Sequence, residues 1–168
     1  MLFGSLFPKE EALSAYTVDY ERLYAAGYRG LLFDIDNTLV MHGAPATPEA
    51  VSLFAHLHRM GFRTCLISNN RKPRVAPFAE AVGSAYLEKA GKPSKKGMRR
   101  AMEVLETSPK ETVLIGDQLF TDIWAAGRIG MYSILVQPIH PKEEIQIVLK
   151  RFLERPLLFF YRCFRKKS

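Results

Sequence analysis

Acidic, hydroxyl, amide and amine side chains recur in this sequence directly after short apolar runs. Asp34 and Asp36 stand at the end of the run that contains Leu31, Leu32 and Phe33. The other polar residues at comparable positions are Asn37, Thr38, Ser68, Asn69, Asn70, Lys92, Asp117 and Asp122. This combination suits phosphoryl transfer, because the transferred group is anionic and must be neutralised and positioned while a nucleophile attacks in line.

The carboxylates of this set predict a Mg²⁺ site. Asp34 and Asp117 supply the hard oxygen ligands that Mg²⁺ prefers, and they leave other positions for water and a substrate phosphate. Asp122 lies within reach of either the metal ion or Lys92. A bound cation would let the anionic Asp34 approach an anionic phosphate.

Asp36 follows Asp34 by two residues. In an extended chain such side chains point the same way, so Asp36 is expected to protonate the leaving oxygen and later to deprotonate the hydrolytic water. Ser68, with Asn69 beside it, is expected to contact the phosphoryl oxygens through hydrogen bonds, and Lys92 through its charge.

The elements that must position these residues alternate along the chain. Apolar runs predict strands at 30–34, 63–68, 85–87, 112–115 and 131–136. Helices are expected at 72–82, 93–105 and 119–128, after Asp19 up to Gly27, and from Pro48 to Gly61 with Thr47 as N-cap. The fold class is therefore α/β, a three-layer, Rossmann-like open parallel sheet with helices on both faces. In such sheets ligands gather beyond the carboxyl ends of the strands.

The 168 residues, 48% of them hydrophobic, suffice for one core. We expect a single domain over 1–149, with its core at about 28–136, and a C-terminal tail over 150–168. The tail carries seven Lys or Arg and one Glu, a net charge of +6, which leaves +1 of the total +7 for residues 1–149. The basic character belongs to the tail, and we expect no nucleic-acid partner.

The tail mixes aromatic and aliphatic residues with cations, as segments at membrane interfaces do. We expect it to lie on an anionic membrane surface, with Pro156 interrupting a continuous helix. Packing of its apolar residues on the body, or a dimer contact, stays open. Cys65 and Cys163 offer no disulfide framework, and no stretch approaches a membrane span. The expected location is cytoplasmic, with peripheral attachment to the inner face of the membrane.

Four segments, D-I-D-N-T-L, I-S-N-N, G-K-P and G-D-Q-L-F-T-D, resemble in order and spacing the motifs of haloacid dehalogenase superfamily phosphatases. The resemblance covers about 28–136. It implies that Asp34 is a nucleophile that becomes transiently phosphorylated and also a metal ligand. It makes Asp36 the acid/base and a metal ligand through its backbone carbonyl.

The same resemblance assigns roles to the later motifs. Ser68 and Lys92 would bind the phosphoryl group, and Asp117 would bind the metal ion. Asp122 would lie near the metal, or orient Lys92, because the spacing of the last two acids varies among these phosphatases.

Only 23 residues lie between Ser68 and Lys92, and fewer than thirty between the first motif and the strand of Ser68. Neither span has room for a cap domain, and capless members of the superfamily act on large, polymeric or membrane-embedded phosphates. S-N-N, A-G-K-P and G-D-Q-L-F-T-D resemble the YqeG-like proteins, relatives of the phosphatases that convert phosphatidylglycerophosphate to phosphatidylglycerol. A-A-G-R at 125–128 departs from the Gly-Gly-Asn-Arg type expected there. The expected substrate is thus a phosphorylated lipid head group.

Two alternatives remain open. The first is a capless phosphatase of another large phosphate, either a phosphoprotein or a nucleic-acid end. The second is a phospho-accepting receiver domain, whose acids, hydroxyl and lysine also surround Mg²⁺. The order of residues disfavours the receiver, since this chain begins its series with D-x-D and ends it with acids. Arg71, Arg74 and Arg128 could bind a second phosphate or simply be solvated.

Overall fold

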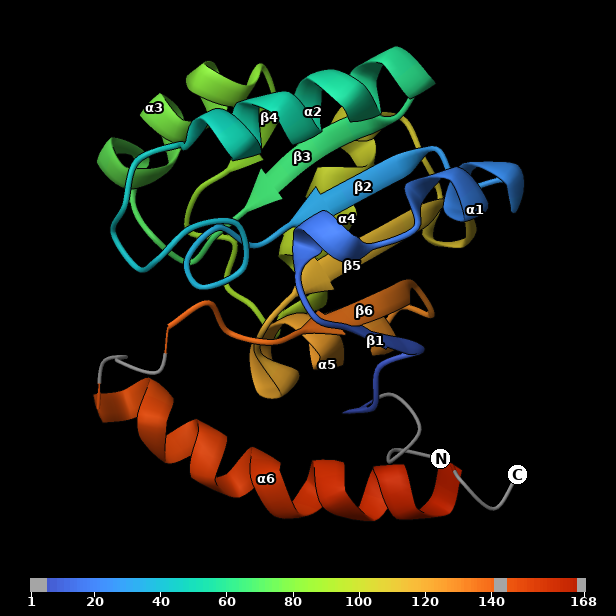
Figure 1. Ribbon diagram of the computed structural model, residues 1–168, viewed down its shortest axis with the longest axis vertical. Coiled ribbons are helices and arrows are strands. Elements are labelled where there is room, and N and C mark those ends of the chain that lie inside the picture. Colours follow the sequence, from blue (N-terminus) through green and yellow to red (C-terminus); the bar gives the residue numbers. More distant parts are fainter. Residues whose placement is uncertain (1–5, 141–144, 166–168) are drawn as a thin grey trace.

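The computed structural model describes residues 6–140 and 145–165. Its centre is a parallel sheet of six strands in the order β1-β6-β5-β2-β3-β4 (Figure 1). The strands are β1 (Glu10–Ala12), β2 (Gly30–Phe33), β3 (Arg63–Ile67), β4 (Ala85–Leu87), β5 (Thr112–Gly116) and β6 (Tyr132–Val136). The predicted open parallel sheet is confirmed.

Helices cover both faces of this sheet. They are α1 (Tyr20–Ala25), α2 (Pro48–Met60), α3 (Lys72–Val82), α4 (Lys95–Leu105), α5 (Trp124–Gly127) and α6 (Ile145–Arg165). The apolar residues of α1, α2 and α3 pack in one cluster, and those of α4 and α5 pack in another on the opposite face. Single helices follow β2 and β3, so among the described residues no cap domain is inserted at either point.

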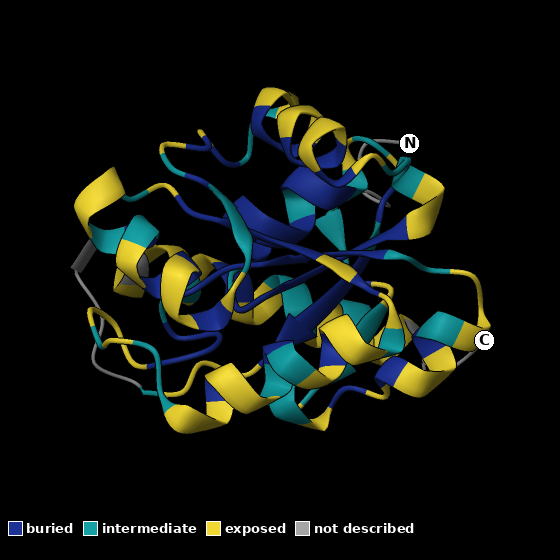
Figure 2. Cartoon of the chain, turned by 90° about the horizontal axis from the view of Figure 1, so that it is seen from above, coloured by how far each residue is buried: buried dark blue, intermediate teal, exposed yellow. Residues whose placement is uncertain are grey.

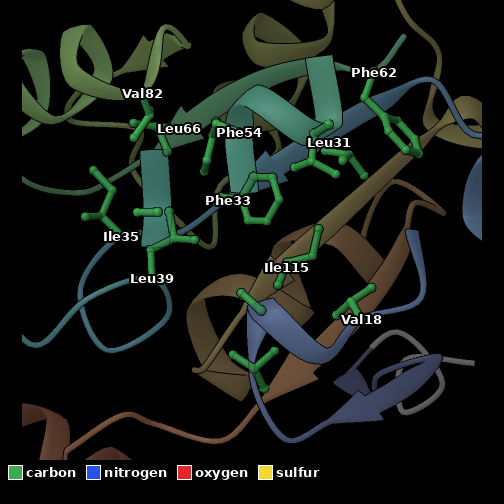
Figure 3. Packing of buried hydrophobic residues seen from close by; sticks show 14 of the residues in the cluster. Val18, Leu31, Phe33, Ile35, Leu39, Phe54, Phe62, Leu66, Val82 and Ile115 are labelled. Carbon is green, nitrogen blue, oxygen red and sulfur yellow. The ribbon is translucent and has the colours of Figure 1, made fainter. Parts of the chain in front are cut away.

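Strand β2 separates the two clusters. Side chains of a strand alternate between faces, so Leu31 and Phe33 join the α2 side while Leu32 joins the α4 side. All four residues of β2 are buried, which accounts for the unbroken apolar run. Figure 2 shows the strands at the centre of the molecule coloured mostly as buried. The Phe33 and Phe54 rings lie 5.0 Å apart between centroids, and this pair fills the space between sheet and helix (Figure 3).

Local signals set the ends of α2 as predicted. The Thr47 side chain accepts a hydrogen bond of 3.2 Å from the Ala50 N–H, and Pro48 occupies the first helical position. Gly61 ends the helix in a left-handed conformation, with φ of 98°. Helix α4 begins at Lys95 instead of residue 93, because Ser94 acts as its N-cap.

Three elements differ from expectation. Strand β1, which the sequence did not reveal, pairs with β6 at the edge of the sheet. The segment expected as one helix over 119–128 is a π-helical turn, η4 (Leu119–Ile123), followed by the short α5. The expected interruption at Pro156 is wrong: α6 continues through it, with Pro156 on its exposed side.

Helix α6 begins at Ile145, ahead of the expected start of the tail, and runs past the β1 edge of the sheet (Figure 1). Leu157 and Leu158 pack against a small cluster of Leu119, Ile123 and Leu135. No helix in the described part of the chain is long and apolar enough to cross a bilayer. The tail residues 166–168, which include two lysines, lie outside the described residues.

The contact of Phe54 with the sheet gives a stability prediction. Phe54→Ala leaves a cavity beside Phe33 and should lower the free energy of unfolding by about 3–5 kcal/mol, measured by urea denaturation. Val51→Ala on the same helix is the control, because Val51 is exposed and its truncation should cost less than about 1 kcal/mol. Equal losses in the two variants would contradict this account of the core.

Candidate active site

Sheet topology brings the carboxyl ends of β2, β3 and β5 together. The chain passes from β2 to β3 and β4 on one side and returns to β5 on the other, so β2 lies at a switch point. Beyond these ends is a cavity of about 200 Å³. Its lining residues are Asp34, Asp36, His42, Ser68, Asn69, Asn70, Lys92, Gln118, Thr121 and Lys150. The structure therefore brings the predicted Asp34, Asp36, Ser68, Asn69 and Lys92 to one cavity.

Three acids form a buried cluster at this edge. Oxygens of Asp34, Asp117 and Asp122 all lie within 4.8 Å of one another. Asp122 is fully buried, and the other two are nearly so. Closely spaced carboxylate oxygens are the donor set of a hard divalent cation, so the residues present fit such a metal ion. The Asp36 side chain is not part of this cluster among the described residues.

Lys92 is the counter-charge within the cluster. Its Nζ donates hydrogen bonds of 2.6 Å to Asp34 Oδ1 and 2.6 Å to Asp122 Oδ1. Charge-assisted hydrogen bonds of this length are strong, and a buried lysine needs such partners because its ammonium group has lost its hydration. Asp122 thus holds Lys92 and also belongs to the acidic cluster. Both of these positions were considered for it from the sequence.

Burial and crowding shift the pKa values of these groups. Burial raises the pKa of the Asp34 carboxyl, with Lys92 opposing the shift and the two other acids adding to it. Burial and the Asp122 carboxylate raise the pKa of Asp117 to about 6, against the effect of Arg151. For Lys92, burial acts to lower the pKa, but Asp122 and Asp34 outweigh it and raise the pKa. A divalent cation would relieve the crowding of negative charge.

A close approach at Gly116 positions Asp122. A Cβ at Gly116 would lie 2.6 Å from the Asp122 carboxyl carbon, so no side chain fits there without moving Asp122. Asp122 Oδ2 also accepts a hydrogen bond of 3.1 Å from the Gln118 N–H. The end of β5 and the π-helical turn η4 together fix the second acid of G-D-Q-L-F-T-D.

Asp117 is fixed from two directions. Its Oδ1 accepts a hydrogen bond of 3.0 Å from Thr38 Oγ1, which comes from the first motif. Its Oδ2 pairs with the guanidinium of Arg151 on α6. Thr38 was included in the polar set without a role, and Arg151 was counted only as a tail cation. Neither contact has a local sequence signal, because the partners are far apart in the chain.

The segment around Lys92 is held by side chains near the cavity. Asn69 Oδ1 accepts from the Lys92 N–H at 2.8 Å, and Asn69 Nδ2 donates to the Lys92 carbonyl at 3.2 Å. Arg128 Nη1 donates to the Pro93 carbonyl at 3.1 Å, after a cis Lys92–Pro93 bond. Asn69 here orients Lys92, and its contact with phosphate stays a prediction. Arg128 binds backbone in this arrangement.

Asp36 lines the cavity but is held by a different set of donors. Its carboxylate accepts from the Gly43 N–H at 2.8 Å, from Asn70 Nδ2 at 2.7 Å and from Arg74 Nη2 at 2.8 Å. Asp36 lines the same cavity as Asp34, and the next residue, Asn37, turns the chain with a positive φ of 61°. Arg74, considered for phosphate binding, is thus a partner of Asp36.

Comparison with known proteins identifies the family. The profile of the haloacid dehalogenase-like hydrolases matches residues 41–130, a span that begins after Asp34 and includes the later motifs. A Bacillus subtilis (strain 168) protein named probable phosphatase YqeG is 33% identical over 159 residues, covering 94% of this chain and 92% of its own length. The chain belongs to the haloacid dehalogenase-like hydrolases. It is a phosphatase of that superfamily.

A further relative of this haloacid dehalogenase-like protein is named as a phosphatase of a phospholipid. The chloroplastic phosphatidylglycerophosphate phosphatase 1 of Chlamydomonas reinhardtii is 29% identical over 172 residues, which cover 91% of this chain and 64% of that protein. Among solved structures, a Bacteroides fragilis protein assigned to the haloacid dehalogenase-like hydrolases has a TM-score of 0.56 at 17% identity, over 71% of this chain and 92% of that one. The structural likeness bears on the fold alone.

The close approach at Gly116 can be tested in this phosphatase. Gly116→Ala must displace Asp122, so Lys92 loses a partner, and the rate of aryl phosphate hydrolysis should fall at least about tenfold. Gly83→Ala is the matched control, since its Cβ meets nothing within 4 Å and only its left-handed backbone is disfavoured. The control should lose about 1 kcal/mol of stability and keep its activity. Full activity of the Gly116 variant would show that the position of Asp122 does not matter.

Proposed function

We propose that this protein is a Mg²⁺-dependent phosphomonoester hydrolase that acts through an aspartyl phosphate on Asp34. The observation that carries this proposal is the bridge of Lys92 between Asp34 and Asp122 within a cluster of three buried acids. The bridge places the Lys92 ammonium beside Asp34, which lines the cavity. A positive charge there reduces the repulsion between the Asp34 carboxylate and an anionic phosphate. Asp34, Asp117 and Asp122, with the Asp36 carbonyl, would hold the ion, which would neutralise phosphate charge.

The residues of the cavity then divide the reaction between them. An Asp34 carboxylate oxygen attacks phosphorus, and the bond from phosphorus to the ester oxygen breaks. Asp36 gives a proton to the departing oxygen, then takes one from the water that attacks the aspartyl phosphate and releases inorganic phosphate. Lys92 and Ser68 bind the non-bridging oxygens, and Asn69 keeps Lys92 in place.

Asp36 must exchange partners for this role. Arg74 and Asn70 hold its carboxylate at the cavity wall, and both donate hydrogen bonds to it. A carboxyl group that gives a proton to the leaving oxygen must face that oxygen, so these contacts must loosen as substrate enters. The Arg74 contact therefore belongs to the resting enzyme.

For the substrate we propose a phosphorylated lipid head group, with phosphatidylglycerophosphate as the first candidate. The name of the Chlamydomonas reinhardtii relative supports this class. Helix α6 supports it independently, because Lys150 on this helix lines the cavity and seven large apolar residues of the helix are exposed. A lipid phosphate would therefore meet the cavity beside an apolar helix.

The outer surface of α6 forms one continuous apolar face. Its exposed members are Val148, Leu149, Phe152, Leu153, Phe159, Phe160 and Phe164. With 3.6 residues per turn they fall within an arc of roughly 160°, which contains no charged residue. Arg155 adjoins this arc, and the tail bears a net charge of +6. We propose that the face rests on an anionic membrane, giving peripheral attachment at its inner surface.

Substrate panels separate the lipid proposal from its alternative. Phosphate release would be measured with phosphatidylglycerophosphate in mixed micelles, a phosphopeptide and a 5′-phosphorylated oligonucleotide, each with and without Mg²⁺. Preference for the lipid is expected. Turnover of only the peptide or oligonucleotide would retain the phosphatase and reject the lipid substrate.

Asp34→Asn should abolish turnover. The amide is a poor nucleophile and a weak metal ligand, so phosphate release should fall by about 1,000-fold or more. Circular dichroism should show an unchanged fold. Glu80→Gln, an exposed carboxylate-to-amide change on α3, is the control and should retain full activity. Comparable turnover in the Asp34 variant would rule out the aspartyl phosphate.

The apolar face of α6 gives a binding prediction. The double change Phe152→Ser and Phe159→Ser removes two exposed rings and should weaken sedimentation with phosphatidylglycerol vesicles at least about tenfold. Val104→Ser, an exposed apolar position on α4, is the matched control and should bind vesicles normally. A change of oligomeric state in the double variant, with unaltered vesicle binding, would instead make this face a contact between two copies.

A further inference from the structure

Arg151 connects helix α6 to the acidic cluster of the site. Its Nη2 pairs with Asp117 Oδ2, and its Nη1 donates a hydrogen bond of 3.0 Å to the Asp117 carbonyl. The Asp117 side chain is fully buried, and 20% of the Arg151 side chain is exposed. A tail residue thus reaches a carboxylate that the site needs for its metal ion.

The guanidinium and a metal ion have overlapping requirements. Asp117 Oδ1 already accepts from Thr38 Oγ1, so with Arg151 both carboxylate oxygens have donors. A divalent cation among Asp34, Asp117 and Asp122 would meet a fixed positive charge at contact distance from one of its ligands. Like charges in a buried site repel strongly because little water screens them. Arg151 bound as seen here therefore opposes metal binding.

The described side chains of this helix that contact the body lie on one of its faces. Glu154 accepts a hydrogen bond of 3.1 Å from the Phe120 N–H in the π-helical turn η4. Further along, Tyr161 donates to the Pro8 carbonyl at 2.8 Å and stacks on Phe7. The opposite face is the apolar arc. Arg151 is thus the one described α6 residue paired with a carboxylate of the acidic cluster.

We propose that α6 is an autoinhibitory element: docked on the body, its Arg151 competes with the metal ion for Asp117, and an anionic lipid surface that takes up α6 relieves the competition. The part concerning lipid rests on the proposed membrane function, whereas the competition at Asp117 does not. Arg151 lies on the face opposite the apolar arc, so it reaches an interfacial lipid phosphate only when α6 leaves the body; such a phosphate then offers the guanidinium a bidentate partner in exchange for Asp117.

Thermodynamic linkage makes this proposal quantitative. If the docked helix weakens metal binding by some factor, the metal ion weakens docking by the same factor. Lipid that draws α6 from its docked position must then tighten Mg²⁺ binding, and Mg²⁺ must tighten vesicle binding. Both effects must vanish when Arg151 loses its charge. Coupling of this kind is typically about 5-fold to 150-fold.

The first experiment is a Mg²⁺ titration without lipid or substrate. Trp124, the chain's single tryptophan, begins α5 two residues after Asp122, so its fluorescence can report on the cluster. Arg151→Gln should bind Mg²⁺ about tenfold more tightly than the parent. Arg155→Gln removes an exposed arginine from the same helix and should bind Mg²⁺ as the parent does. Calorimetry gives the same constants if the fluorescence change is small.

The second experiment repeats the titration with vesicles of phosphatidylglycerol and phosphatidylcholine. Vesicles should tighten Mg²⁺ binding by the parent and leave Arg151→Gln unchanged. Screening of the vesicles by Mg²⁺ affects both proteins alike, so the difference between them isolates the coupling. Vesicles of phosphatidylcholine alone should have no effect on either protein.

Distinct results overturn distinct parts. Weaker or unchanged Mg²⁺ binding by Arg151→Gln rejects the competition and would fit a guanidinium that supports the metal site. Tighter binding with no response of the parent to vesicles rejects the relief by lipid and leaves the phosphatase proposal untouched. Arg151→Lys guards against misfolding: it keeps the charge and loses the paired geometry, so its Mg²⁺ affinity should lie between the other two.

Discussion

Three carboxylates buried within one small cluster are the constraint on which the rest of this structure depends. Each loses hydration, and each repels the others, so the cluster is tenable only with buried cations beside it. Lys92 meets two of the acids and Arg151 meets the third. Neighbouring residues hold these charges in place. Asn69 binds the Lys92 backbone, and the absence of a side chain at Gly116 lets Asp122 pack against the end of β5.

The fold supplies this cluster through one central strand. Because β2 is buried on both faces, its sequence is an unbroken apolar run, and the first ionisable residue after it is Asp34. The sheet, its flanking helices and the positions of Asp34, Ser68, Lys92 and Asp117 were therefore predictable from periodicity, caps and the strand-end rule. These signals are local, which is why they can be read from a sequence.

The features that sequence reasoning missed depend on distant contacts. Strand β1 has no apolar run, and it is a strand because the edge of β6 accepts it. Pro156 removes one hydrogen-bond donor from α6, yet Leu157, Leu158 and Tyr161 pack on the body and stabilise the helix through it. Arg74, which lies 38 residues further along the chain, donates to the Asp36 carboxylate, and this contact has no local signal in the sequence.

Helix α6 combines two properties that packing on its own domain does not require. Its outer arc is apolar although it faces water, and on its inner face Arg151 pairs with Asp117 of the site. Exposure of the apolar arc to water is unfavourable unless something covers it, and the pairing of Arg151 with Asp117 would oppose metal binding unless the contact can be released. An anionic lipid surface would cover the apolar arc and attract the guanidinium of Arg151, which is why we propose that lipid binding by α6 and metal binding by the acidic cluster are linked.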